Sequence, residues 1–340
     1  METIWYAIIA FTLTAYVILD GFDLGTGALH LWIARSEDER NRTLAAIGPF
    51  WDGNEVWLLA AGGVLYLSFP AVYAASFSGF YLPLIMIVWL FILRGIGIEF
   101  RSHIGNPLWK SFCDVIFSWS SLLLAIFMGA GLANVIRGVP LNKEGYFFEP
   151  LWTTFTVSQY PGILDWYTVF IGVFALITVS VHGANYIALK TEGALNMRAR
   201  RTAAIAGWAM GILTPLSLIV TLQVRPQMLD NYRSHSWGVL FPIAVFLSMA
   251  GFAYFRMRRD DLGAFISSSV FIAAMLGGAA FALYPYILPA TTDSSLGMTV
   301  HNSAAHAYGL RVGLAWWILG IILAIGYFSY LFRTFRGKTG

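Results

Sequence analysis

Long apolar runs separated by short polar segments dominate the hydrophobic pattern of this 340-residue chain. A helix needs about 20 mainly apolar residues to span the hydrocarbon core of a bilayer. Nine runs reach that length, and they cover roughly residues 4–34, 44–68, 71–100, 111–137, 162–189, 202–222, 237–256, 262–288 and 308–333. The pattern therefore predicts an all-α, polytopic membrane protein with about nine transmembrane helices.

The whole chain, residues 1–340, is expected to form a single integral membrane domain. Residues 1–137 would form a first four-helix unit, residues 162–288 a second, and residues 308–333 a ninth helix. The longest connecting segment, at about 138–161, is too short for a separate soluble domain. It is interpreted as a connector.

Lys and Arg residues set the predicted orientation, because short cytoplasmic loops retain positive charge. With nine spans, 16 of the 21 basic residues fall on one side of the membrane. The other side holds only Arg137, Lys143, Arg225, Arg233 and Arg311. We therefore expect the N-terminus outside and the C-terminus in the cytoplasm.

Composition agrees with a lipid environment. Hydrophobic residues make up 58% of the chain and charged residues only 11%, whereas soluble domains have about 25% charged residues. The single cysteine, Cys113, excludes an internal disulfide and a cysteine-based metal site made by this chain alone. The N-terminus lacks the basic segment of a cleavable signal peptide, so the first apolar run is expected to stay as a span.

Two acidic residues, Asp20 and Asp23, interrupt the first apolar run. Their spacing of three places both on one face of a helix. A carboxylate at membrane depth costs roughly 2.5–3.5 kcal/mol on insertion scales, so it usually faces a partner or a water-filled cavity. The alternative is that both acids cap a break in this helix at the neighbouring glycines.

A second acidic pair, Asp52 and Glu55, lies at the start of the second predicted span. Acidic residues in a first turn are also favoured by the helix dipole, which is the alternative explanation. The first span runs inward and the second runs outward. Both acidic pairs are therefore expected in the cytoplasmic half of the membrane.

Other polar residues are expected at a similar depth. Arg94 and Glu99 lie near the end of the third span, and Asn54 and Trp57 flank Glu55 in the second. We predict a polar pocket in which Arg94, Glu99, Asn54 and Trp57 are partners of the acids. Chains of acids and amides are typical of proton or cation pathways.

The six histidines do not favour a haem or metal site. Five fall at predicted span ends or in loops, and only His182 lies within a span, so no haem ligand and no metal ligand is predicted in this chain. Phosphate-binding and zinc-protease motifs are absent from the sequence.

The acidic motifs resemble subunit II of cytochrome bd-type quinol oxidases. The likeness is carried by the segments Asp-Gly-Phe-Asp-Leu-Gly at 20–25, Trp-Asp-Gly-Asn-Glu-Val-Trp-Leu at 51–58, and further segments at 73–81, 94–102, 131–134 and 138–140. It covers the first 140 residues strongly. The remainder is similar mainly through helix count and the Tyr284-Pro285 and 294–296 regions.

This resemblance implies a heterodimer with a nine-helix subunit I that carries two b-type haems, one d-type haem and the quinol site. The complex would oxidise quinol and reduce oxygen to water, with protons drawn from the cytoplasm. Asp52 matches the family's acid at the start of a proton path at the subunit boundary, and Asp23 matches a second motif acid. Helical spacing extends this proton pathway to Asp20 and Glu55. Some members hold a structural quinone in this subunit.

The resulting hypothesis is a haem-free subunit of a membrane quinol:oxygen oxidoreductase in the bacterial cytoplasmic (inner) membrane, which supports assembly and proton delivery. Membrane lipid and small single-helix subunits are further candidate partners, and nucleic acid is not. One alternative is a cation-coupled secondary transporter that uses the same acids, for which broken helices are expected. Another is a structural scaffold whose acids only form interhelical pairs.

Overall fold

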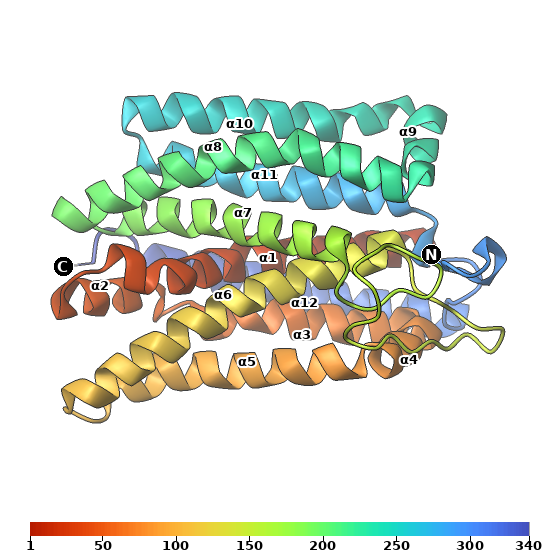
Figure 1. Ribbon diagram of the computed structural model, residues 1–340, viewed down its shortest axis with the longest axis horizontal. Helices are drawn as coiled ribbons and strands as arrows, with labels where there is room; N and C mark the ends of the chain where they lie inside the picture. Colours follow the sequence, from red (N-terminus) through yellow and green to blue (C-terminus); the bar gives the residue numbers. More distant parts are fainter. Residues whose placement is uncertain (340) are drawn as a thin grey trace.

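The computed structural model describes residues 1–339 and consists of one long helical bundle. Nine helices of this range have 18 or more residues. They lie lengthwise in the bundle, and the two termini are at opposite ends (Figure 1). The nine helices are α1 (Glu2–Ile33), α3 (Trp51–Ser68), α5 (Tyr81–Glu99), α6 (Pro107–Arg137), α7 (Trp166–Lys190), α8 (Gly193–Val224), α10 (Leu240–Arg258), α11 (Asp261–Leu283) and α12 (Ala307–Thr334).

Eight helices within residues 1–339 are long and apolar enough to cross a membrane. The remaining long helix, α3, carries Asp52, Asn54 and Glu55 in its first turns, which lowers its mean hydropathy. The predicted fold class, an all-α polytopic membrane protein, is confirmed. The count of nine spans, the orientation and the division into two four-helix units stay predictions.

Short elements occupy the two ends of the bundle. They are α2 (Glu37–Ile47), α4 (Pro70–Gly79), α9 (Asp230–Ser234), the strands β1 (Tyr286–Leu288) and β2 (Met298–Thr299), and 3-10 turns at Phe100–Ser102, Pro226–Leu229, Ser236–Val239 and Ser294–Leu296. The two strands pair antiparallel in the connection before α12. The loops at the ends are therefore more structured than plain connectors.

Three predicted spans had the wrong bounds. The span at 44–68 includes the end of α2, which is a separate helix with a capping box made by Ser36 and Glu39. Pro49 separates it from α3, because proline has no backbone N–H to continue a helix. The span at 71–100 is likewise two helices, α4 and α5, that meet at Phe80. The span at 262–288 ends at Leu283, two residues before Pro285, and its last residues form β1.

Helix α1 is the centre of the bundle and packs on α3, α6, α7 and α11. Its glycines permit this close packing. A Cβ atom at Gly25 would lie 1.9 Å from the backbone oxygen of Val179 on α7, and one at Gly27 would lie 2.1 Å from Oγ of Ser121 on α6. These glycines therefore allow neighbouring helices to approach and do not break α1, which is continuous.

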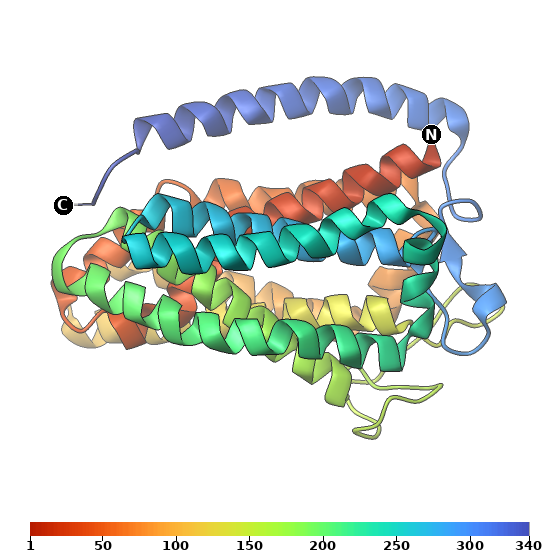
Figure 2. The same ribbon diagram turned by 90° about the horizontal axis from the view of Figure 1, so that it is seen from above.

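Helix α12 lies at the periphery, set off from the other long helices (Figure 2). Only Leu310 and Leu331 of α12 are buried. Its apolar outer side chains, such as Trp316 and Leu323, are exposed, as expected of surface that faces lipid or another membrane subunit.

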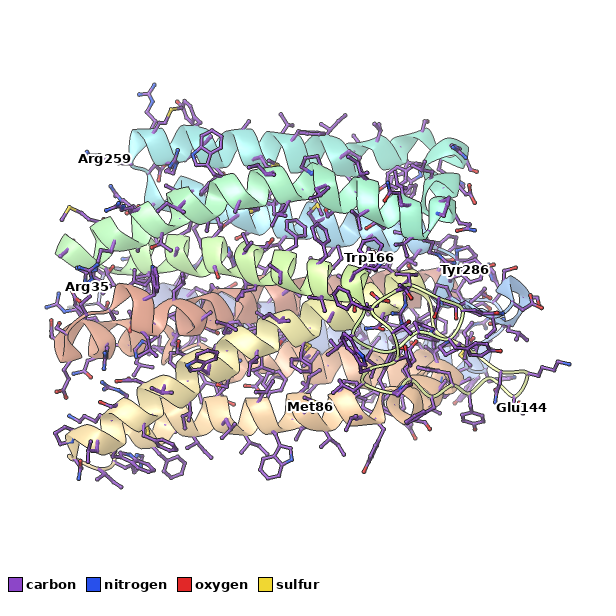
Figure 3. All side chains as sticks on the ribbon, viewed as in Figure 1. Arg35, Met86, Glu144, Trp166, Arg259 and Tyr286 are labelled. Atoms are coloured by element: carbon purple, nitrogen blue, oxygen red, sulfur yellow. The ribbon has the colours of Figure 1, made fainter. Side chains whose placement is uncertain are left out.

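Charged loop residues mark the two ends. Figure 3 shows Arg35 and Arg259 at the end that holds the C-terminus, and Glu144 and Tyr286 at the opposite end. We call these the C-terminal end and the N-terminal end of the bundle. The predicted orientation places the C-terminal end at the cytoplasm.

Candidate functional site: a buried acid–arginine cluster

The first acidic pair lies inside the bundle. Asp20 and Asp23 are both fully buried in the second half of α1, towards the C-terminal end. Because α1 runs unbroken from Glu2 to Ile33, the alternative that these acids cap a break in the helix is wrong. Each acid instead meets a partner on another helix.

Asp20 is paired with Arg94 of α5. The guanidinium donates through Nη1 to Oδ2 at 3.0 Å and through Nη2 to Oδ1 at 2.5 Å. Both side chains are fully buried. A bidentate pair of this geometry fixes both groups more firmly than a single bond, so Arg94 holds α1 and α5 together at this depth.

Asp23 is bonded to Asn54 of α3. The amide nitrogen of Asn54 donates to Asp23 Oδ2 at 2.7 Å and to the backbone oxygen of Leu19 at 3.2 Å. The other carboxyl oxygen, Oδ1 of Asp23, is buried without a protein partner, as is the amide oxygen of Asn54. Asp23 therefore has one free oxygen, whereas Asp20 has none.

The second acidic pair leads outward from the cluster. Glu55 lies with Oε2 3.9 Å from Arg94 Nη1, and its side chain is 26% exposed. Asp52, one turn earlier in α3, is exposed. Asp52, Glu55 and the buried groups thus form a series from the surface of the chain to its interior. The helix-dipole explanation also applies to Asp52, which lies in the first turn.

Glu99 is not part of this cluster. It lies exposed near the end of α5. Five residues separate it from Arg94, and five residues rotate a helix by about 500°, which turns Glu99 some 140° away from the buried face. The prediction of Glu99 as a pocket partner was therefore wrong.

Trp57 is buried but faces a different surface. Its indole nitrogen has no protein partner, and its ring packs on Phe11 and Phe328. It lines an open groove of about 400 Å³ between α1, α3 and α12, together with Phe11, Ala15, Leu19, Ile325, Phe328, Ser329 and Phe332. The groove is almost entirely apolar.

The two histidines buried in the described part of the chain have both ring nitrogens bonded within the protein. His182 is fully buried, but its two ring nitrogens are bonded to Ser268 and to the backbone oxygen of Ile18. His30 is bonded at both nitrogens to Thr43 and Asp114. The remaining histidines are exposed at the bundle ends. Within residues 1–339 no group of three or more His, Cys, Asp or Glu side chains could hold a metal ion.

A second buried ionic group lies at the N-terminal end and was missed in the sequence. Arg137, at the end of α6, donates to Glu149 at 3.0 Å and is also paired with Asp165 and Asn134. Burial raises the pKa of Glu149 to about 7, although Arg137 opposes this shift. This group ties the 138–165 connection to α6 and α7. An arginine at a predicted helix end, followed by acids in the next loop, was the available signal.

A third group closes the C-terminal end between α1, α2 and α6, and it was also missed. Asp114 of α6 accepts hydrogen bonds from His30 at 2.8 Å, from Arg40 at 3.0 Å and from Arg101 at 2.6 Å. Asp114 is almost completely buried. Its partners come from three distant parts of the sequence, so no local pattern could have identified it. We call these four residues the Asp114 network.

Together the helices and the cluster define a polytopic membrane protein that buries the carboxylates Asp20 and Asp23 beside Arg94 in its bundle. The model of the family described as cytochrome bd terminal oxidase subunit II matches residues 1–335. The chain belongs to this family, whose complex is an oxidoreductase.

Individual relatives agree with this assignment. The chain is 27% identical to cytochrome bd-I ubiquinol oxidase subunit 2 of Escherichia coli (strain K12), with 96% of this chain and 91% of the relative covered. It is 26% identical to cytochrome bd ubiquinol oxidase subunit 2 of Bacillus subtilis (strain 168), with 92% and 89% covered. A chain of the bd oxidase from Geobacillus thermodenitrificans has the same fold, with a TM-score of 0.78, 18% identity and 98% of both chains covered.

Proposed function

We propose that this chain is the subunit II of a cytochrome bd-type quinol oxidase, pairs with a haem-bearing subunit I, and delivers protons from the cytoplasmic side. The single observation that carries the proposal is the acidic series on α3 and α1. It runs from exposed Asp52 through half-buried Glu55 to the fully buried pair of Asp20 and Arg94. Proton transfer between such groups needs hydrogen-bond reach or an intervening water.

The redox chemistry belongs to subunit I in this proposal. Its two b-type haems and one d-type haem supply electron transfer and oxygen reduction when bound. In support, both buried histidines of this chain have their ring nitrogens occupied. The residues of this chain would bind no haem, and would orient and move protons only.

The proposed setting is the bacterial cytoplasmic (inner) membrane, with the C-terminal end at the cytoplasm. The excess of basic residues at that end supports this orientation. It places Asp52 on the cytoplasmic side. The exposed part of α3 and α12 would then contact subunit I, lipid or small single-helix subunits.

A structural quinone would fit the groove beside Trp57. Its walls are apolar, as an isoprenoid-bearing ring requires, and the unpaired indole N–H of Trp57 could donate to a quinone oxygen. This cofactor would be structural because the groove holds no titratable side chain.

The variant Asp52→Asn tests the proton role in the purified complex reconstituted into vesicles. We expect slower oxygen reduction or charge translocation with a normal haem spectrum, because an amide cannot accept and release the proton. Glu99→Gln is the matched control, since it removes an exposed acid outside the cluster. Wild-type turnover and charge movement in Asp52→Asn would refute the proton role, and loss of haem together with activity would indicate a scaffold.

The cation-coupled transporter is the other candidate. Its main support was a helix break at the glycines near Asp20 and Asp23, and α1 is continuous there. Ion-coupled solute uptake by this chain alone in vesicles would favour the transporter over the oxidase subunit.

A further inference from the structure

Two buried hydroxyls next to the acidic cluster lack hydrogen-bond partners. Thr26 of α1 and Ser121 of α6 are both fully buried, and neither hydroxyl oxygen has a partner in the protein. Other helical hydroxyls behave differently: Thr12 and Thr14 donate to backbone oxygens four residues earlier in α1. Since a buried unpaired polar group costs about 1–3 kcal/mol, these two hydroxyls indicate an additional partner.

Helix geometry brings both hydroxyls to Asp23. Thr26 follows Asp23 by three residues and Gly27 follows it by four, so both are neighbours of Asp23 on one face of α1. Ser121 lies against Gly27, where a Cβ atom would be 2.1 Å from its hydroxyl oxygen. The Ser121 hydroxyl therefore lies close to where a side chain at position 27 would begin. Position 27 is about one helical turn, roughly 5.4 Å, from Asp23. One water molecule can bridge groups at such separations.

Charge balance distinguishes Asp23 from Asp20. Arg94 neutralises Asp20 through both of its oxygens, and no cation in the described residues 1–339 bonds to Asp23. Asp23 Oδ2 accepts from Asn54, whereas Oδ1 is free. A buried carboxyl without a cation is most stable with a proton. That proton would be on Oδ1, which then needs an acceptor.

We propose that Asp23 holds a proton on Oδ1 and shares an internal water with Thr26 and Ser121, so that these three residues form a proton-holding site. This inference rests on the proposed proton role of the chain. Uptake breaks the O–H bond of protonated Glu55 and forms one O–H bond at Oδ1 of Asp23. Release to the same side breaks the Oδ1–H bond and forms the O–H bond at Glu55 again. The step moves no electrons and needs no other reactant.

Water is the ligand that the site favours over a metal cation. The unpaired buried atoms of the cluster include the donor Arg94 Nε as well as the acceptor Asp23 Oδ1. A metal cation can satisfy acceptors only, whereas water satisfies both kinds.

The Asp114 network closes this site towards the C-terminal end. Asp114 precedes Ser121 by seven residues, so both lie on the same face of α6. Both oxygens of Asp114 are occupied, and two arginines surround one carboxylate. The resulting positive charge opposes the passage of protons. Protons would therefore reach Asp23 from the α3 side.

Infrared difference spectroscopy on the purified complex of this chain with its co-purifying partner tests the site. We expect a band of a protonated carboxyl that is lost in Asp23→Asn. In Thr26→Val and Ser121→Ala the band should shift to higher wavenumber, because the carboxyl loses its water partner. Thr26→Ser should restore the wild-type position, and Thr12→Val is the matched control because its hydroxyl is bonded within α1.

The outcomes separate this inference from the proposed function. Absence of a band that depends on Asp23, or a band unmoved by Thr26→Val and Ser121→Ala, would overturn the proton-holding site even if Asp52→Asn slows charge movement. The expected band shifts together with wild-type charge movement in Asp52→Asn would support the site and refute the proton pathway through Asp52.

Discussion

The guanidinium of Arg94 is held by both carboxylate oxygens of Asp20, at 3.0 and 2.5 Å, with both side chains fully buried. Asp20 lies on α1 and Arg94 on α5, 74 residues apart. This pair connects the central helix of the bundle to a helix with a largely exposed surface. Arg94 also lies between Asp20 and Glu55, and within residues 1–339 it is the one cation bonded to the cluster.

Removing Arg94 should destabilise the bundle. In Arg94→Ala, Asp20 is left as a buried unpaired carboxylate, and breaking a buried pair in this way costs about 3–5 kcal/mol. The midpoint of thermal unfolding of the purified complex should fall clearly. The double variant Arg94→Gln with Asp20→Asn should be less affected, because it leaves no unpaired charge. An unchanged unfolding midpoint in Arg94→Ala would contradict a stabilising role for this pair.

Glu55 is expected to carry protons between Asp52 and the buried cluster. Glu55→Gln should slow proton uptake during turnover by about 100-fold, the lower end of the range for a lost acid–base group. Glu99→Gln should leave uptake unchanged, since Glu99 is exposed and outside the cluster. Proton uptake by vesicles that contain the complex provides the measurement. Equal effects of the two variants would rule out a specific role for Glu55.

The ionic group around Arg137 should make stability depend on pH. Burial raises the pKa of Glu149 from 4.5 to about 7. Between these values the folded chain keeps the proton and the unfolded chain has lost it. The stability that Glu149 contributes is therefore fully present below its unfolded pKa and is lost as the pH rises through its folded pKa. The total change is about 3 kcal/mol.

Thermal unfolding of the complex between about pH 4 and pH 8 measures this effect. Trypsin cleavage at the exposed Lys143 reports the same change in the 138–165 connection. Glu149→Gln should flatten the profile, because the amide does not titrate. A slope that persists in Glu149→Gln would assign the pH dependence to another group.

The groove beside Trp57 should contribute to quinone retention. Trp57→Phe keeps an aromatic ring but removes the unpaired indole N–H, so loss of one hydrogen bond of about 1 kcal/mol should lower the affinity roughly fivefold. Quinone extracted from the purified complex gives the readout. Trp316→Phe is the control because Trp316 is exposed on α12, away from the groove. Identical quinone content in Trp57→Phe and wild type would exclude a bond to the indole.

Parts of the fold could be predicted because membrane burial leaves a local signal. A bilayer requires each spanning helix to satisfy its own backbone, so apolar length alone located most long helices. The bounds failed near Pro49, Phe80 and Pro285, where the chain stays apolar while the helix ends. Hydropathy does not register such interruptions, because they depend on backbone geometry.

The candidate site could likewise be predicted only in part from the sequence. Helical spacing correctly placed Asp20 and Asp23 on one buried face, and the choice of Arg94 as a partner agrees with its ion pair. The prediction for Glu99 was wrong because it considered depth along α5 and not the rotation of about 140° that a spacing of five residues from Arg94 implies. The group around Arg137 left a signal in the sequence, an arginine at a span end followed by acids in the next loop. The Asp114 network joins residues from separate helices, so its partners could not be read from any local segment.

The sequence by itself determined that this chain lies in a membrane, that it is helical, and which acidic motifs mark its family. Each of these depends on composition and short-range spacing. Only the tertiary structure decided which acids are paired and which oxygen remains free. The packing of α3 and α6 on α1 brings Asn54 to Asp23 and sets Ser121 against Gly27, and Arg94 reaches Asp20 from α5. Those contacts depend on how distant helices meet, and that arrangement distinguishes a structural carboxylate from one that is free to hold a proton.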